Sequence, residues 1–417
     1  MKVDTMRWID RVVGVPLCAL VSGVMRVGWA LRRARPRPVR KVLFVELSEM
    51  GTTILADPAM RKARDHFGAE LFFVIFAKNA GSLDLLGTVP KANTFTIRDT
   101  SLMTLALDTL AFLVWTRRNG IDTVFDLELF SRFTSLMTGL AGADRRIGFH
   151  RFHNEGLYRG EMLTHRVAYN PHIHVSKNFI ALIDAIDIAP RSEPLSKSLI
   201  GDEQVKLIPP AIDDTLREGV RARIASLAPP AAVRRIVLIN PNASDLLPHR
   251  RWMKDRYAET IRRVLAAHDD VLVLITGAPA EAEEAAMLAG AVADPRCISF
   301  AGKTSLAELP ALYSLATLMV SNDSGPAHFA AATGLHTIVL FGPETPRLYQ
   351  PLGNSSAIYA GLACSPCVSA HNHRKTACTD NVCMQAISVE QVVAAVDAAL
   401  RETATAGRSD GTPAAVA

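Results

Sequence analysis

The stretch that decides the fold is residues 317–341, TLMVSNDSGPAHFAAATGLHTIVLF. It predicts a buried strand over 317–321, a polar turn, a helix over 327–333 and a second strand over 336–341. The same alternation precedes it, with strands at 235–240, 271–276 and 297–300 and helices at 254–267, 281–291 and 306–314. Strands that alternate with helices in this way predict a parallel sheet covered on both faces.

The first half of the chain shows the same pattern. Strands are predicted at 42–47, 71–76 and 124–129, and helices at 53–67 and 133–140. The 417 residues exceed the usual size of one domain, so we expect an α/β fold of two doubly wound, Rossmann-like domains facing each other across a cleft. The predicted organisation is an N-terminal arm (1–40), two domains (41–190 and 233–402), a Pro-rich linker (191–232) and a disordered tail (403–417).

Charge is concentrated at the start of the chain. Residues 1–41 contain ten Lys and Arg against two Asp, whereas the whole chain carries a net charge of only +5. A nucleic-acid-binding protein usually spreads its basic residues over a folded face, so we expect no nucleic-acid partner. We expect the arm to face a membrane instead.

The arm also contains an apolar segment, residues 12–25, followed by a basic cluster from Arg26 to Lys41. Fourteen residues are fewer than the roughly 20 needed to span a bilayer, and the charges follow the segment rather than precede it as in a secretory signal. The pattern predicts an amphipathic helix lying on the inner face of the cytoplasmic membrane, and hence a cytoplasmic, peripheral protein. The alternative is a helix that docks on the protein's own surface or on a partner.

Residues 321–328, Ser-Asn-Asp-Ser-Gly-Pro-Ala-His, form the turn between a strand and a helix. Backbone N–H groups at such a helix start can bind a diphosphate, and Gly325 allows close approach of the ligand. Ser244 and Arg250, which follow another strand, are suited to phosphate oxygens. The alternative for Asp323 and Ser324 is an ordinary helix cap.

Four motifs together resemble glycosyltransferase family 9, the heptosyltransferases of lipopolysaccharide core synthesis, over residues 40–400. The motifs are Leu47-Ser-Glu-Met-Gly51, the loop from Asn242 to Trp252, Asn322-Asp-Ser-Gly-Pro-Ala-His328, and Cys364-Ser-Pro-Cys367. The resemblance implies two domains of the GT-B type, a nucleotide-sugar donor in the C-terminal half, with ADP-heptose favoured, and inverting, metal-independent transfer to a lipid-linked glycan acceptor.

The resemblance also implies roles for individual residues. Asp323 would contact the donor sugar, Ser324 and Gly325 would contact the diphosphate, and His328 would support the loop. Arg250 stands where family members often have a lysine for the phosphates. Glu281 is a candidate for the ribose hydroxyls.

One position departs from the family pattern. The family's catalytic base is an Asp directly after the glycine of the first turn, Gly51, but here that position is Thr52. A threonine hydroxyl is not a base at neutral pH, so we predict that Glu49 takes this role, with Glu46 and Asp57 as weaker candidates. Two alternatives stay open: a catalytically silent protein that binds a nucleotide sugar, and a nucleotide-sugar epimerase, which would need no acceptor.

Two further clusters have more than one interpretation. Cys364, Cys367, Cys378 and Cys383 have spacings close to those of a structural zinc site, but reduced thiols are favoured and a disulfide is a third option. We expect this segment to be a lid or an acceptor-side loop. Residues 150–177 are rich in His, Arg and Lys and could bind an anionic acceptor, although a solvated loop with satisfied histidines is the favoured reading.

Overall fold

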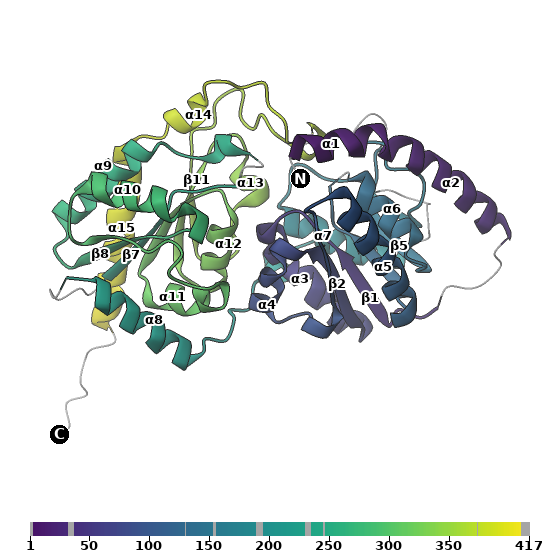
Figure 1. The fold of residues 1–417 in the computed structure, drawn as a ribbon, viewed down its shortest axis with the longest axis horizontal. Coiled ribbons are helices and arrows are strands. Elements are labelled where there is room, and N and C mark those ends of the chain that lie inside the picture. Colours follow the sequence, from purple (N-terminus) through teal and green to yellow (C-terminus); the bar gives the residue numbers. More distant parts are fainter. Residues whose placement is uncertain are drawn as a thin grey trace. The chain divides into compact units, whose positions relative to one another are not determined.

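The computed structural model describes residues 3–31, 37–129, 131–152, 156–188, 195–229, 235–244, 247–372 and 374–409. The chain divides into two α/β units (Figure 1). One unit consists of Met1–Leu207 and Val368–Thr376, and the other of Ile208–Cys367 and Ala377–Ala417. Arg32, Arg33 and Arg35 of the predicted basic cluster lie outside the described residues.

The N-terminal unit is built on a six-stranded parallel sheet in the order β3-β2-β1-β4-β5-β6. Helices α3 (Met50–Phe67), α4 (Gly81–Leu86) and α7 (Val175–Asp184) pack on one face, and α5 (Leu102–Asn119) and α6 (Arg132–Leu140) on the other. The strands are β1 (Lys41–Val45), β2 (Glu70–Phe76), β3 (Thr94–Ile97), β4 (Thr123–Asp126), β5 (Arg145–Phe149) and β6 (His165–Val167).

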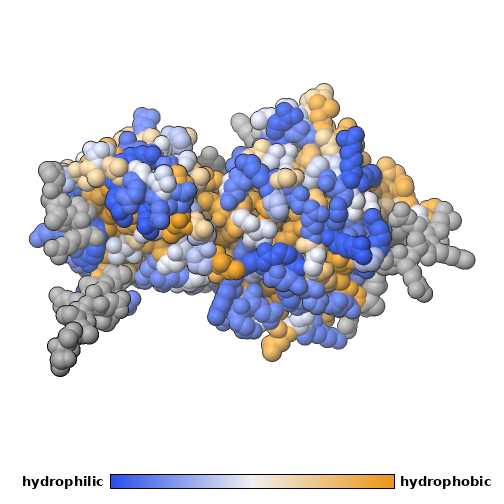
Figure 2. Space-filling view, turned by 90° about the horizontal axis from the view of Figure 1, so that it is seen from below, coloured by the Kyte–Doolittle hydropathy of each residue, from blue (hydrophilic) through white to orange (hydrophobic). Residues whose placement is uncertain are grey.

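Two helices precede this sheet, α1 (Val3–Val12) and α2 (Gly14–Leu31). They are docked on the N-terminal unit: Asp10 accepts hydrogen bonds from the backbone N–H groups of Arg132 and Phe133, and the Ser22 hydroxyl accepts one from Glu161 N–H. In the described part of the chain, one helical stretch, Thr5–Gly28, is long and apolar enough to cross a membrane. Hydrophobic side chains reach the surface of this unit beside hydrophilic ones (Figure 2).

The C-terminal unit contains a second six-stranded parallel sheet, in the order β12-β11-β10-β7-β8-β9. Its strands are β7 (Arg235–Asn240), β8 (Val271–Ile275), β9 (Cys297–Ser299), β10 (Leu318–Asn322), β11 (His336–Phe341) and β12 (Ser355–Tyr359). Its helices are α8 (Asp214–Leu227), α9 (Lys254–Ala267), α10 (Ala282–Val292), α11 (Leu309–Leu315), α12 (Gly325–Ala332), α13 (Pro346–Tyr349), α14 (Val382–Gln385) and α15 (Val389–Ser409).

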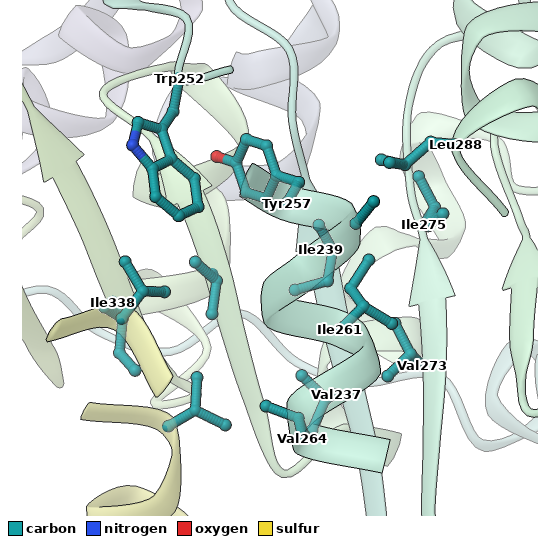
Figure 3. Packing of buried hydrophobic residues seen from close by; sticks show 14 of the residues in the cluster. Val237, Ile239, Trp252, Tyr257, Ile261, Val264, Val273, Ile275, Leu288 and Ile338 are labelled. Carbon is teal, nitrogen blue, oxygen red and sulfur yellow. The ribbon is translucent and has the colours of Figure 1, made fainter. Parts of the chain in front are cut away.

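One core cluster of the C-terminal unit lies between one face of this sheet and helices α9, α10 and α15. Alternate residues of the strands, such as Val237 and Ile239, point to this side and meet Tyr257 and Ile261 of α9 (Figure 3). Trp252 is buried just before α9, and its indole N–H donates to Ile387 O at 3.1 Å. Burial of this apolar surface is the main force that fixes α9, and with it the loop that leads into α9.

Both sheets have the doubly wound order, since each places its first strand beside its fourth. The order of the strands reverses between β1 and β4 and between β7 and β10. At such a point the loops after the two neighbouring strands run in opposite directions and leave a crevice at the carboxyl edge of the sheet. The predicted fold class is therefore confirmed, and each unit has one position where a ligand site is expected.

The predicted boundaries can be compared with the elements. The division between the units at Leu207 falls within the predicted linker, 191–232. Helix α15 continues to Ser409, beyond the start of the predicted tail at 403, and residues 410–417 lie outside the described part.

Candidate active site

In the C-terminal unit, the loops after β7 and β10 are tied together by Asn322, which is completely buried. Its side-chain oxygen accepts hydrogen bonds from Trp252 N–H and from the Tyr257 hydroxyl, each at 3.0 Å. Its amide donates to Pro241 O at 2.7 Å. These bonds fix Pro241 and Trp252, and with Tyr257 the start of α9, against the end of β10. The sequence motif contained Asn322, but its positioning role was not predicted.

This arrangement brings together three of the predicted donor-binding residues. The Arg250 guanidinium lies 3.7 Å from an Asp323 carboxylate oxygen and donates to the Ser244 hydroxyl at 3.3 Å. Arg250 is only 8% exposed and Asp323 4%. Within the described residues, Arg250 Nε has no hydrogen-bond acceptor. A buried cation with donors to spare is suited to an anionic ligand, because burying a charge is costly unless it is paired and hydrogen-bonded.

The start of α12 lies directly beside this pair. Ser324 is the residue before the helix, and its side chain does not cap it, so the helix-cap alternative fails for Ser324. The Ser324 hydroxyl instead lies 3.3 Å from that of Ser321. Gly325 and Pro326 form the first turn, as predicted, so the positive end of the helix dipole lies just after the end of β10.

Two other predicted donor-site residues, His328 and Glu281, contribute to the local structure of their helices. His328 is buried within α12. A Glu281 carboxylate oxygen accepts from Ala278 N–H at 2.6 Å, which closes the turn before α10. A side chain at Gly277 would come within 2.9 Å of Glu281 and 3.1 Å of Asn242, so this carboxylate lies against the loop that follows β7. Glu281 is thus close to the predicted donor site but is already engaged in a local hydrogen bond.

In the N-terminal unit, Glu49 is the residue before α3, at the carboxyl end of β1. One of its carboxylate oxygens, Oε2, accepts from the Thr52 hydroxyl at 3.4 Å, and the other forms an ion pair with Arg374. Gly51 is buried in the first turn of α3. The structure thus places Glu49 and Thr52 side by side at the point where the strand order of this sheet reverses.

Arg374 comes from the segment Val368–Thr376, which packs with the N-terminal unit although it follows β12 in the sequence. His371 of the same segment makes an edge-on ring contact with Tyr169 at 6.0 Å. Arg374 has φ 52°, a left-handed conformation that costs about 1–2 kcal/mol for a non-glycine residue. Local strain at an ion pair with Glu49 is typical of a functional position.

Two further carboxylates lie below this turn. Glu46 is buried and accepts from the Ser48 hydroxyl and from Glu49 N–H, at 3.3 and 3.4 Å. Glu128, after β4, accepts from the N–H groups of Leu47 and Ser48. Burial raises the pKa of Glu46 well above its ordinary value, and the negative charges of Glu128 and Glu49 add to the rise. Burial raises the pKa of Glu128 as well.

The other predicted candidates have structural partners. Asp57 is buried inside α3, where it pairs with Arg61 at 3.1 Å and accepts from the Thr88 hydroxyl. In the basic span 150–177, Arg166 pairs with Glu161, and Lys177 with Asp202. These contacts support the reading of a span with satisfied side chains, while His153 lies outside the described residues.

None of the six cysteines, all of which are described, forms a disulfide in the structure. Asn381 separates two of the four clustered ones: its N–H donates to Cys378 Sγ at 3.3 Å, and its side-chain oxygen accepts from the Cys383 thiol at 3.5 Å. Burial raises the pKa of Cys383. Across the described ranges, no three His, Cys, Asp or Glu side chains are arranged to hold a metal ion. His373 is outside these ranges.

Two doubly wound sheets, one of them with a buried arginine at the reversal of its strand order, have the architecture in which nucleotide ligands are commonly bound. The model of glycosyltransferase family 9 (heptosyltransferase) matches residues 117–377. Because this match covers well over half of the chain, the chain belongs to that family.

Relatives and solved structures agree with this assignment. The chain is 27% identical to lipopolysaccharide core heptosyltransferase OpsX of Haemophilus influenzae over 240 residues, which is 57% of this chain and 62% of OpsX. It is 27% identical to lipooligosaccharide heptosyltransferase 2 of Campylobacter jejuni over 168 residues, 38% of this chain and 49% of the relative. The matched regions therefore span only about half to three fifths of these relatives.

Among solved structures, Escherichia coli ADP-heptose lipopolysaccharide heptosyltransferase II superposes with a TM-score of 0.66 at 18% identity, covering 87% of this chain and 99% of that one. Escherichia coli heptosyltransferase WaaC with ADP gives a TM-score of 0.58 at 17% identity, covering 86% and 99%. At these identities the likeness establishes the shared fold.

Proposed function

We propose that the protein transfers a heptosyl residue from ADP-heptose to a lipid-linked glycan acceptor, with inversion at the anomeric carbon. The observation that carries this proposal is the buried Arg250 beside Asp323, at the strand reversal of a family 9 chain. Related structures support the choice of donor, since WaaC is known with ADP and with ADP-2-deoxy-2-fluoro heptose.

The leaving group is ADP, whose diphosphate gains negative charge as the bond to the sugar breaks. Arg250 and the N-terminal turn of α12 supply positive charge at the place where that charge develops. This pairing stabilises the leaving group electrostatically, so we propose that transfer needs no metal ion. Asp323, next to Arg250, accepts hydrogen bonds from the hydroxyls of the donor sugar.

The acceptor hydroxyl must lose its proton as its oxygen attacks the anomeric carbon. We propose Glu49 as the base, with the proton going to Oε2, because the other oxygen is engaged by Arg374. The Thr52 hydroxyl, which donates to Oε2, orients the carboxylate. Thr52 is thus a positioning residue at the place where the family pattern has its acidic residue.

Substitutions at these two positions test the assignment of the base. Glu49→Gln should abolish transfer and leave donor affinity unchanged, because glutamine keeps the shape of the side chain and is not a base. Thr52→Asp introduced into Glu49→Gln should restore part of the activity by placing a carboxylate at the family position. Full activity of Glu49→Gln alone would exclude Glu49 as the base.

The donor can be identified by thermal shift with a panel of nucleotide sugars. A ligand that binds the folded state raises its stability by about 2.7 kcal/mol when present at one hundred times its Kd, which raises the melting temperature. We expect ADP-heptose to give the largest shift, and UDP- and GDP-sugars to give little. A larger shift with a UDP-sugar would contradict the proposed donor.

A lipid-linked acceptor places the reaction at a membrane, and we propose that the protein acts there as a peripheral protein of the inner face. The bonds from Asp10 and Ser22 to the rest of the N-terminal unit hold α1 and α2 along its surface. Helices held in this way are suited to lie on a membrane rather than to cross it. Release of the protein from membranes on deletion of residues 1–38 would support this location, and unchanged fractionation would contradict it.

A further inference from the structure

Helix α5 exposes an apolar face that no described residue of its own unit covers. Its exposed side chains recur every three or four residues along about three turns, and the larger ones are 48–70% exposed. These larger side chains are Leu102, Met103, Leu107, Leu110 and Val114. Ala106 and Ala111 lie on the same exposed face, so three turns of α5 present only apolar side chains between them.

The opposite side of α5 is a normal core-facing surface. Phe112 is fully buried against Phe95 of β3, with the ring centroids 5.7 Å apart, and Leu105 and Leu113 pack on the same hydrophobic cluster. Helix α5 is therefore apolar on both sides. Large exposed apolar patches mark interaction sites.

Helix α5 lies on the same side of its sheet as α1. The cluster that receives Phe112 is made by alternate residues of β1, β2 and β4, and it also receives Met6 of α1 and Met137 of α6. Helix α2 packs on α6 as well, because Cys18 is buried against the backbone of Arg132. Helices α1, α2 and α5 thus lie on the same side of the sheet.

The N-terminal helices present an apolar stripe of the same kind. In α2 it follows helical spacing over four turns and consists of residues that are 41–66% exposed. The stripe comprises Leu17, Leu20, Val24 and Val27 of α2 and Val13, the residue just before this helix. In α1, Trp8 is 62% exposed, and aromatic side chains of this type are enriched at the membrane–water boundary.

We propose that α5, together with α1 and α2, forms one surface that binds an anionic membrane. Charge favours lipid as the occupant: exposed Arg117 and Arg118 end the apolar face of α5, and exposed Arg11 lies beside that of α1. Basic residues at the edge of an apolar face bind anionic head groups, while the aliphatic side chains enter the lipid boundary. This inference rests on the proposed function in one respect, since a lipid-linked acceptor requires access to a membrane.

The surface can be tested by flotation of the full-length protein with vesicles of phosphatidylethanolamine and phosphatidylglycerol, and with vesicles of phosphatidylcholine alone. Leu107→Gln/Leu110→Gln changes α5, and Leu20→Gln/Val24→Gln changes α2. The matched control is Leu199→Gln, an apolar residue of the same unit that is 95% exposed and lies outside these helices. Circular dichroism verifies that each variant is folded, which is expected because all the changed side chains are exposed.

We expect wild type and the Leu199 variant to float with the anionic vesicles, and each double variant to bind them about tenfold more weakly or worse. Equal binding of the α5 variant and wild type would overturn the inference. So would an α5 variant that turns a wild-type dimer into a monomer without lipid, because the face would then be a protein interface. Donor thermal shifts should stay unchanged in every variant, so a failure of the proposed donor site is seen separately from a failure of membrane binding.

Discussion

Replacing Arg250 by methionine removes the cation from the donor site and keeps most of the side-chain volume. Hydrogen bonds to charged groups contribute about 1.5–3 kcal/mol each, so loss of the contact between Arg250 and the diphosphate should weaken ADP binding about ten- to hundredfold. Asp323 would also lose the ion pair at 3.7 Å, while it remains 4% exposed. A buried carboxylate that loses an ion-pair partner is destabilised, so we expect a lower melting temperature for the unliganded variant as well.

Isothermal titration calorimetry with ADP, AMP and adenosine isolates the charge effect. The loss of binding affinity caused by Arg250→Met should be largest for ADP and close to zero for adenosine, because we propose that the guanidinium binds the phosphates. Arg250→Lys should lose less affinity for ADP than Arg250→Met. Lys254→Met, which removes an exposed cation paired with Glu284, is the control for net charge and should bind ADP like wild type. An equal loss of affinity for ADP, AMP and adenosine would refute the assignment of Arg250 to the diphosphate.

Three further outcomes are expected. Asn322→Ala should destabilise the protein by about 2–4 kcal/mol in urea unfolding, because it leaves the buried Tyr257 hydroxyl without its acceptor; a change below about 0.5 kcal/mol would contradict the role given to Asn322. Because the pKa of Glu46 is raised in the folded state, wild type loses stability as pH rises above 4.5. The variant Glu46→Gln lacks this titration, so its melting temperature should rise relative to that of wild type in melting curves taken from pH 5 to 8. Burial lowers the pKa of His165 from 6.5 to about 4, so wild type should lose stability as pH falls through this window, and His165→Gln should lose less.

Much of the fold could be predicted because strands and turns carry local signals. The strands at 235–240, 271–276 and 336–341 were placed within a residue of their observed ends. Helix α5 was missed, because its apolar residues occur on both sides and show no clear amphipathic period. The surface that α5 forms was therefore missed with it.

Some residues of the candidate site could likewise be predicted from local sequence, whereas its long-range contacts could not. Residues 322–328 lie in one contiguous motif, and Ser244 and Arg250 follow a strand that proved to be the neighbour of β10. The contact between Glu49 and Arg374 joins positions that are 325 residues apart, and no local pattern could reveal it. The Asn322 network could have been suspected, because a buried amide between a strand and a helix must find partners.

We propose that this chain transfers a heptosyl residue from ADP-heptose to a lipid-linked acceptor. The most direct measurement incubates the purified protein with ADP-heptose and a lipid-linked core glycan acceptor, then follows the acceptor by mass spectrometry. We predict that the acceptor gains the mass of one heptosyl residue, that ADP is released in equal amount, and that chelation of metal ions changes neither. Binding of ADP-heptose with no change in the acceptor and no release of ADP would contradict the claim and would identify a catalytically silent nucleotide-sugar-binding protein.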